Sequence, residues 1–243
     1  LAFTIPHANN EAKAKGMEVP ELGEFAAKDW PAPEKAKAAM ITLMDRDVGR
    51  LLDRLKALNL EKNTLVLFTS DNGPHKEGGA DPAFHDSNGP LRGIKRDLTE
   101  GGIRVPMLVR WPGQTKAGAV SQTVWAHWDV LPTLAAVAGV KAPDKLDGIS
   151  LLPALRGKKM PVHPTLYWEF HERGFAQAVR MGNWKAIRNN PGAPLELYDL
   201  QTDAGEQTNV ADKHPEILQQ IENYLKTART PSPLWPGQAA PNR

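Results

Sequence analysis

The sequence predicts an α/β fold with a mostly parallel sheet, followed by a small C-terminal α+β subdomain with an antiparallel sheet. An amphipathic helical pattern runs directly into a nearly all-apolar stretch, TLVLFT at residues 64–69, which is typical of a strand covered on both faces. Four short candidate strands lie close together after residue 160, and one helix follows them. We therefore predict an α/β part over residues 1–160 and the subdomain over residues 161–243.

The first elements lead to a possible site. Residues 1–5 form an apolar run that predicts a buried strand, and since the chain opens inside such a run, we expect further sequence before Leu1. Apolar residues recur at helical spacing from Glu34 to Leu60, which predicts a long amphipathic helix. The strand at residues 64–69 follows. SDNGPH comes next, outside the carboxyl end of a strand, where open α/β sheets bind ligands.

The remaining elements follow from local signals. The segment 78–102 is rich in glycine, proline and charge and is long for a connection, which favours a functional loop. Residues 105–111 (VPMLVRW) predict another strand. Asp129 can cap a helix that ends at Ala138, with Gly139 closing it. The later predicted elements are strands at Thr165–Phe170, Ala176–Met181, Trp184–Arg188 and Glu196–Asp199 and a helix at Pro215–Thr230.

Composition disfavours several classes of partner. Thirty Lys and Arg against 28 Asp and Glu give a net charge of +2, and the basic residues are scattered, which argues against nucleic acid. No stretch approaches the roughly 18 apolar residues that a membrane span requires. The absence of cysteine excludes disulfides, thiolate zinc sites and cysteine nucleophiles within these residues.

Asp71 and Asn72 are candidate metal ligands. Adjacent oxygen donors on a tight turn can both face one hard cation, and the pair contains no imidazole, which favours Ca²⁺ or Mg²⁺ over zinc. The alternative is a plain hairpin turn, because Asn-Gly is a common hairpin dipeptide. The all-apolar strand before Asp71 weakens that alternative, since a hairpin strand with one wet face should alternate.

His7 and Lys95 are candidates for contact with an anion. His7 follows an expected strand end, where an imidazole can donate a hydrogen bond or a proton, with a structural or solvated loop histidine as the alternative. Lys95 lies between glycines that let the backbone fold closely and the ammonium point at an anion. Arg92, Arg96 and Arg104 compete for that role, and their chemistry alone does not choose among them.

Five further residues are candidates for substrate binding. His75 and His85 lie near the expected mouth of the site, with satisfied or solvated loop histidines as the alternative. Trp168, His171 and Arg173 lie in YWEFHERG, where aromatic and charged side chains can line a sugar pocket. For Trp168 a place in the core is an equal alternative.

Longer stretches resemble the type I sulfatases, arylsulfatase-like enzymes of the alkaline phosphatase superfamily. FTSDNGPH and GPLRGIKRDLTEGGIRVPMLVRWPG resemble the second half of the family signature. TIPH, HWDVLPTLAAVAG, DGISLLPAL and LELYDLQTDAGEQTNVADKHPEI extend the resemblance over nearly the whole chain. It implies that residues 1–160 are the C-terminal part of an alkaline-phosphatase-like catalytic sandwich. It also implies hydrolysis of a sulfate ester, of a small molecule or a glycan, in the periplasm or outside the cell.

The resemblance also implies roles for individual residues. In that family a formylglycine, made from the first residue of a CxPSR-type or SxPSR-type motif, attacks sulfur while a divalent cation and basic residues hold the sulfate oxygens. By motif, Asp71 and Asn72 correspond to ligands of the cation, which we expect to be Ca²⁺, with Mg²⁺ as the alternative. Lys95 corresponds to the sulfate-binding lysine. His7 corresponds to the histidine that contacts sulfate or protonates the leaving alcohol.

The chain lacks the motifs that belong to the first half of the family pattern. It contains no CxPSR or SxPSR motif, and the family's paired aspartates and its other lysine and histidine are absent. The resemblance therefore implies that the missing N-terminal half of the protein completes the site and that this chain alone is inactive. A phosphate or phosphonate ester hydrolase of the same superfamily and a noncatalytic module that binds sulfated glycans remain as alternatives. The hydrolase hypothesis predicts that His7, Lys95, Asp71 and Asn72 converge.

Overall fold

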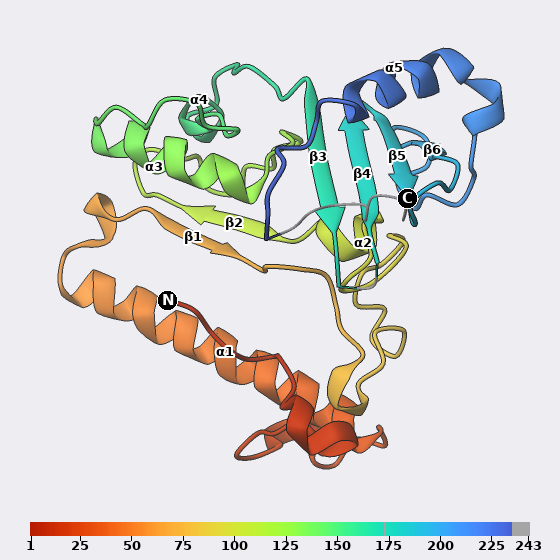
Figure 1. Ribbon diagram of the computed structural model, residues 1–243. Helices are drawn as coiled ribbons and strands as arrows, with labels where there is room; N and C mark the ends of the chain where they lie inside the picture. Colours follow the sequence, from red (N-terminus) through yellow and green to blue (C-terminus); the bar gives the residue numbers. More distant parts are fainter. Residues whose placement is uncertain (173, 235–243) are drawn as a thin grey trace.

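The computed structural model describes residues 1–172 and 174–234 and has a mixed α/β architecture (Figure 1). A two-stranded sheet lies between the helices α1 and α3, and a four-stranded sheet carries α5 (Figure 1). The strands are β1 (Val66–Thr69), β2 (Met107–Arg110), β3 (Thr165–Phe170), β4 (Ala176–Met181), β5 (Trp184–Arg188) and β6 (Glu196–Asp199). The α-helices are α1 (Ala32–Ala57), α2 (Glu100–Ile103), α3 (Val130–Ala138), α4 (Leu152–Leu155) and α5 (Pro215–Leu225).

Six short 3₁₀ helices lie in the connections of the described chain. They are η1 (Asn10–Lys15), η2 (Gly23–Phe25), η3 (Glu61–Asn63), η4 (Glu77–Gly79), η5 (His127–Asp129) and η6 (Ala211–Lys213). Within the described residues, no helix is both long and apolar enough to cross a membrane.

The two-stranded sheet corrects one prediction. β1 pairs antiparallel with β2, with Val66 opposite Arg110 and Thr69 opposite Met107. The four-stranded sheet is antiparallel too, so the prediction of a mostly parallel sheet is wrong for the strands that the structure describes. A parallel neighbour requires a long crossover, usually a helix, to carry the chain back. Between β1 and β2 the chain forms loops, the 3₁₀ helix η4 and the four-residue α2, and it returns in the opposite direction.

The predicted strand at residues 1–5 is also wrong. No strand forms there, and the side chains of Leu1 and Phe3 are 99% and 39% exposed. An apolar run is buried as a strand only where a neighbouring strand satisfies its backbone, and no described strand pairs with this run.

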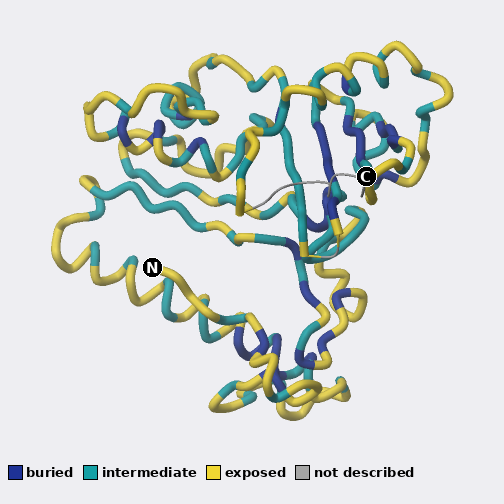
Figure 2. The backbone as a smooth tube through the Cα atoms, viewed as in Figure 1, coloured by how far each residue is buried: buried dark blue, intermediate teal, exposed yellow. Residues whose placement is uncertain are grey.

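Helix α1 confirms the predicted amphipathic helix, but only its first half is covered. Ala36 and Met40 pack against Ala8, Met17 and Ala80 in one of the buried clusters visible in Figure 2. In the second half Leu51 and Leu58 are 40% and 47% exposed. The apolar stripe that the spacing predicts is therefore half core and half surface.

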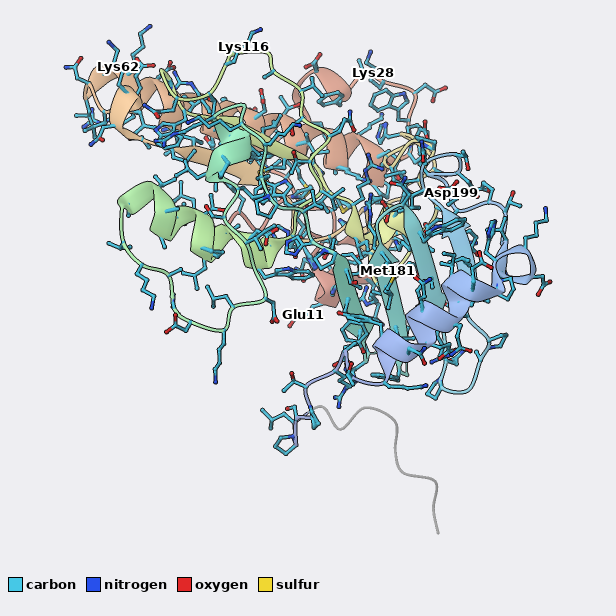
Figure 3. All side chains as sticks on the ribbon, turned by 90° about the horizontal axis from the view of Figure 1, so that it is seen from above. Glu11, Lys28, Lys62, Lys116, Met181 and Asp199 are labelled. Carbon is cyan, nitrogen blue, oxygen red and sulfur yellow. The ribbon has the colours of Figure 1, made fainter. Side chains whose placement is uncertain are left out.

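The four-stranded sheet confirms the predicted strands and buries both of its faces. Alternate residues point to opposite faces of a strand, and the two faces have different partners. One face packs on α5, which lies along the sheet in Figure 3, and it contributes Val179, Ala186 and Leu197 around Ile221 of α5. The other face contributes Ala178, Ile187 and Tyr198 around Leu98, which lies just before α2. The division of the chain at Met160 stays a prediction.

Helix α3 forms where the sequence predicts it and ends at Gly139, whose φ of 70° is left-handed. Asp129 precedes the helix, but its side chain does not cap α3. Its carboxylate instead accepts hydrogen bonds from the backbone N–H groups of Ala126 (2.9 Å) and Ile149 (2.8 Å). Asp129 thus fixes the start of α3 to the loop that leads into α4.

Candidate active site

Backbone hydrogen bonds join the turn after β1 to the segment before β2. The N–H of Gly73 donates to the carbonyl of Gly102 (2.9 Å), and the N–H of Lys95 donates to the carbonyl of Pro74 (2.8 Å). A Cβ atom on Gly73 would lie 1.9 Å from the carbonyl oxygen of Gly101, so this approach requires glycine. The segment that carries Lys95 is therefore fixed beside the turn that carries Asp71 and Asn72.

His75 attaches the N-terminal segment to the same place. Its Nε2 lies 3.0 Å from the carbonyl oxygen of Pro6, and its Nδ1 lies 3.1 Å from Oε2 of Glu77. The side chain is 8% exposed. His75 thus holds the residue before His7 against the turn, which agrees with the alternative of a satisfied loop histidine. Its substrate-binding role stays a prediction.

His7 and Lys95 are in direct contact. Nζ of Lys95 lies 3.0 Å from Nε2 of His7, and Nδ1 of His7 lies 2.7 Å from the carbonyl oxygen of Ala8. A carbonyl oxygen only accepts, so Nδ1 carries a proton, and in the neutral imidazole Nε2 accepts from the ammonium. The imidazole and the ammonium thus form one polar pair.

Glu77, which is not among the residues predicted from the sequence, balances the charges around this pair. Its carboxylate lies 3.4 Å from Nζ of Lys95 and accepts a short hydrogen bond from the guanidinium of Arg96. Burial tends to raise the pKa of Glu77, but the hydrogen bond from Arg96 and the charges of Lys95 and His75 outweigh it and lower this pKa to about 2. Glu77 therefore stays ionised beside Lys95.

Lys95 differs from the three competing arginines in its bonding partners. Arg96 bonds to Glu77 and Glu172, and Arg104 lies 3.8 Å from Glu100. Arg92 donates to the hydroxyl of Tyr198 (3.0 Å). Of these four cations in the described chain, Lys95 is the one bonded to His7.

The Asp71–Asn72 turn presents two oxygen-bearing groups that are not committed to other partners. Nδ2 of Asn72 donates to the carbonyl of Gly73 (2.8 Å), and Nε2 of His127 lies 3.1 Å from the carbonyl oxygen of Ser70. The carboxylate of Asp71 and Oδ1 of Asn72 form no hydrogen bond within the described residues. Hard oxygen donors without other partners suit Ca²⁺ or Mg²⁺.

Asp71 and Asn72 alone would be too few ligands for a metal site. The described residues contain no group of three or more His, Cys, Asp or Glu side chains that could hold a metal ion. Asp71 and Asn72 are thus chemically suited to a hard cation, and a full coordination sphere of six or more oxygens requires further ligands.

The other predicted substrate contacts lie in two different surroundings. His85 packs with Trp30 and Phe84 and lies 3.4 Å from a carboxylate oxygen of Glu34. The ring of Trp168 lies 6.0 Å from that of Trp128, and His171 pairs with Glu169 at 3.3 Å. Arg173 lies outside the described residues. A substrate role for each of these residues stays a prediction.

A buried ionic cluster connects the EGG motif in α2 to the C-terminal sheet. Nζ of Lys185 lies 2.8 Å from Oε1 of Glu100 and 3.2 Å from Oε1 of Glu206. All three side chains are almost fully buried, and Glu206 also accepts from the N–H of Glu100 (2.6 Å). Lys185 points to the same covered face of its strand as Ile187. A lysine at such a position in a predicted strand is the sequence feature that could have indicated a buried ion pair.

Comparisons with known proteins identify the family of this chain. A family model described as Sulfatase matches residues 8–140, more than half of the chain, and one described as N-sulphoglucosamine sulphohydrolase, C-terminal, matches residues 94–230. The chain belongs to the sulfatase family. That family lies within the alkaline phosphatase superfamily.

Individual sulfatases show the extent of the match. Steryl-sulfatase of Mus musculus is 35% identical over 82% of this chain and 38% of that protein. The crystal structure of Ps i-CgsB, also solved in complex with k-i-k-neocarrahexaose, is 31% identical with a TM-score of 0.78 over 94% of this chain and 49% of that one. The structure of BT4656 in complex with its substrate D-glucosamine-2-N,6-O-disulfate is 26% identical with a TM-score of 0.65, over 79% and 40% of the chains. This chain thus spans about two fifths of the length of the curated sulfatases that it matches.

Proposed function

We propose that the protein hydrolyses a sulfate ester of a carbohydrate to an alcohol and inorganic sulfate. The observation that carries the proposal is the contact between His7 and Lys95, 3.0 Å apart, beside the turn of Asp71 and Asn72. A fixed ammonium and an imidazole are suited to bind a tetrahedral anion and to move a proton at its ester oxygen.

Lys95 and His7 have complementary roles in this proposal. The ammonium of Lys95 binds a sulfate oxygen and stabilises the negative charge that develops on the ester oxygen as the bond to sulfur breaks. A bound sulfate offers that ammonium a charged acceptor in place of Nε2 of His7. Nε2 is then free to take up a proton from water and pass it to the oxygen of the leaving alcohol, while the hydrogen bond from Nδ1 to the carbonyl of Ala8 keeps the ring in place.

Asp71 and Asn72 would hold a Ca²⁺ ion, with Mg²⁺ as the alternative. When bound, such a cation withdraws charge from the sulfate oxygens and makes the sulfur more electrophilic. The backbone hydrogen bond between Gly73 and Gly102 keeps Asp71 and Asn72 beside the segment that carries Lys95. We assign the formylglycine nucleophile to sequence outside these 243 residues, since they contain no CxPSR or SxPSR motif.

The proposed substrate is a sulfated carbohydrate, in keeping with the disulfated glucosamine named for BT4656. Family resemblance further supports a periplasmic or secreted location. A phosphate or phosphonate ester hydrolase is the second candidate, because its substrates present a similar tetrahedral anion.

The test uses the protein at its full natural length and compares its kcat/KM on two chromogenic esters. We expect the protein to release 4-nitrophenol from 4-nitrophenyl sulfate with a kcat/KM at least about tenfold above that for 4-nitrophenyl phosphate, a difference of about 1.4 kcal/mol in transition-state stabilisation. A preference for the phosphate would favour the second candidate. Binding of sulfated glycan without any ester hydrolysis would indicate a noncatalytic module instead.

A further inference from the structure

We propose that a hollow beside Lys95 binds the sugar ring next to the sulfated one, so that the preferred substrate is an oligosaccharide. The inference rests on the proposed function. The hollow has a volume of about 390 Å³ and lies between the segment 92–99 and the four-stranded sheet. That volume lies within the range of small-molecule sites. Its lining combines an apolar surface with planar polar side chains, chiefly Phe170, Arg92, Asp97, Asn189 and Glu196.

The apolar part of the lining comes from the sheet. Phe170 of β3 and Ala176 of β4 are directly opposite each other in the antiparallel pairing and both line the hollow. Phe170 also packs against the cluster around Leu98, which limits its movement. A fixed aromatic side chain beside a small residue offers a surface for the apolar C–H face of a pyranose ring.

A hydrogen-bond network holds the polar part in place before any ligand arrives. Nη2 of Arg92 donates to the hydroxyl of Tyr198 (3.0 Å), which donates to Glu196 (2.5 Å). Nδ2 of Asn189 donates to the other oxygen of Glu196 (3.1 Å). Burial, together with the bond to Glu196, raises the pKa of Tyr198 to about 12, so its hydroxyl remains a donor at neutral pH.

Several atoms of these side chains are left for a ligand. Nε and Nη1 of Arg92, Oδ1 of Asn189 and Oδ1 of Asp97 form no hydrogen bond within the described residues. They supply both donors and acceptors, which is what vicinal hydroxyl groups require. The charges of Arg92 and Arg96 are matched by those of Asp97 and Glu196, which favours an uncharged ring with hydroxyls over a second sulfate.

The hollow lies next to the proposed sulfate site. Oε1 of Glu77 is within ion-pair distance of both Lys95 (3.4 Å) and Arg96, and Arg96 lines the hollow. A single carboxylate group therefore separates the Lys95 ammonium from the wall of the hollow. A monosaccharide sulfate that contacts Lys95 leaves the hollow empty, whereas an oligosaccharide can extend into it.

The test measures binding of desulfated κ-neocarratetraose, an uncharged oligosaccharide, by saturation-transfer NMR and calorimetry with the protein at its full natural length. We expect binding by the wild type and a Kd at least about tenfold higher for Arg92→Lys, which keeps the charge but loses the planar fork. Asn189→Ala should weaken binding in the same direction. Asn183→Ala is the matched control, because Asn183 is an exposed asparagine at the other end of β5 and bonds to Gln201.

Two outcomes would overturn the inference. One is the absence of oligosaccharide binding by the wild type, and the other is equal binding by the wild type, both hollow variants and the control. Hydrolysis of 4-nitrophenyl sulfate is measured on the same samples and does not depend on the hollow. If the wild type does not hydrolyse 4-nitrophenyl sulfate, the proposed function is refuted. If it hydrolyses the ester but does not bind the oligosaccharide, only the sugar-binding role of the hollow is refuted.

Discussion

Nζ of Lys95 lies 3.0 Å from Nε2 of His7, although 88 positions separate the two residues. The contact depends on two hydrogen bonds. The one from the N–H of Lys95 to the carbonyl of Pro74 fixes Lys95, and the one between His75 and the carbonyl of Pro6 fixes the segment that carries His7. Both connections end on the turn after β1. The proposed catalytic pair is therefore assembled on the same turn that carries the proposed metal ligands.

Replacement of Lys95 should remove most of the activity. We expect Lys95→Ala to lower kcat on 4-nitrophenyl sulfate by about 10²–10³-fold, because one positioned donor to developing charge contributes about that much. Lys95→Arg should recover only part of it, since a guanidinium does not reproduce the point charge. The control is Lys76→Ala, at a neighbouring exposed lysine. A Lys95→Ala protein with wild-type kcat would contradict the role.

Glu77 should make folding sensitive to acid. Its folded pKa of about 2 is below its ordinary value of 4.5, so its ion pairs stabilise the fold above about pH 4.5, and this contribution disappears as the pH falls towards about 2. Glu77→Gln should therefore be less stable than the wild type at neutral pH, with a difference that shrinks across that interval. Urea unfolding at several pH values measures this, with Glu11→Gln at an exposed site as the control. A difference that is independent of pH would contradict the prediction.

The cluster of Lys185, Glu100 and Glu206 should make Lys185→Met strongly destabilising. The substitution leaves two buried carboxylates without a cation, and breaking a buried pair in this way costs about 3–5 kcal/mol. Adding Glu206→Gln should recover part of the loss, because it removes one of the uncompensated charges. Urea unfolding checks both variants against the exposed Lys62→Met. A loss for Lys185→Met no larger than that of the control would contradict the prediction.

Calcium should stabilise the protein through Asp71 and Asn72. With the protein at its full natural length, Ca²⁺ at about 100 times its Kd should stabilise the folded state by about 2.7 kcal/mol and raise the Tm by several degrees. Asp71→Ala and Asn72→Ala should reduce that rise, and the exposed Asp144→Ala should retain it. The readout is thermal unfolding with Ca²⁺ or with a chelator. An unchanged shift in Asp71→Ala would exclude this carboxylate as a ligand.

Local pattern was enough to predict most elements. The four strands of the C-terminal sheet fall where the sequence predicts short strands separated by turn signals, and α1 and α3 follow from spacing and end signals. These signals involve neighbouring residues, which is why the sequence contains them. The predicted direction of β1 relative to β2 was wrong because an all-apolar strand indicates burial but not the direction of its partner.

The sequence by itself determined the family motifs and the residue types available for chemistry: the Asp71–Asn72 pair, Lys95 and His7. Only the tertiary structure decided which cation among Lys95, Arg92, Arg96 and Arg104 contacts His7, since all four share the same segment and charge. It also revealed Glu77 beside Lys95 and the two carboxylates around Lys185. These interactions join side chains that are far apart along the chain, and such pairs come together only when close packing fixes the loops.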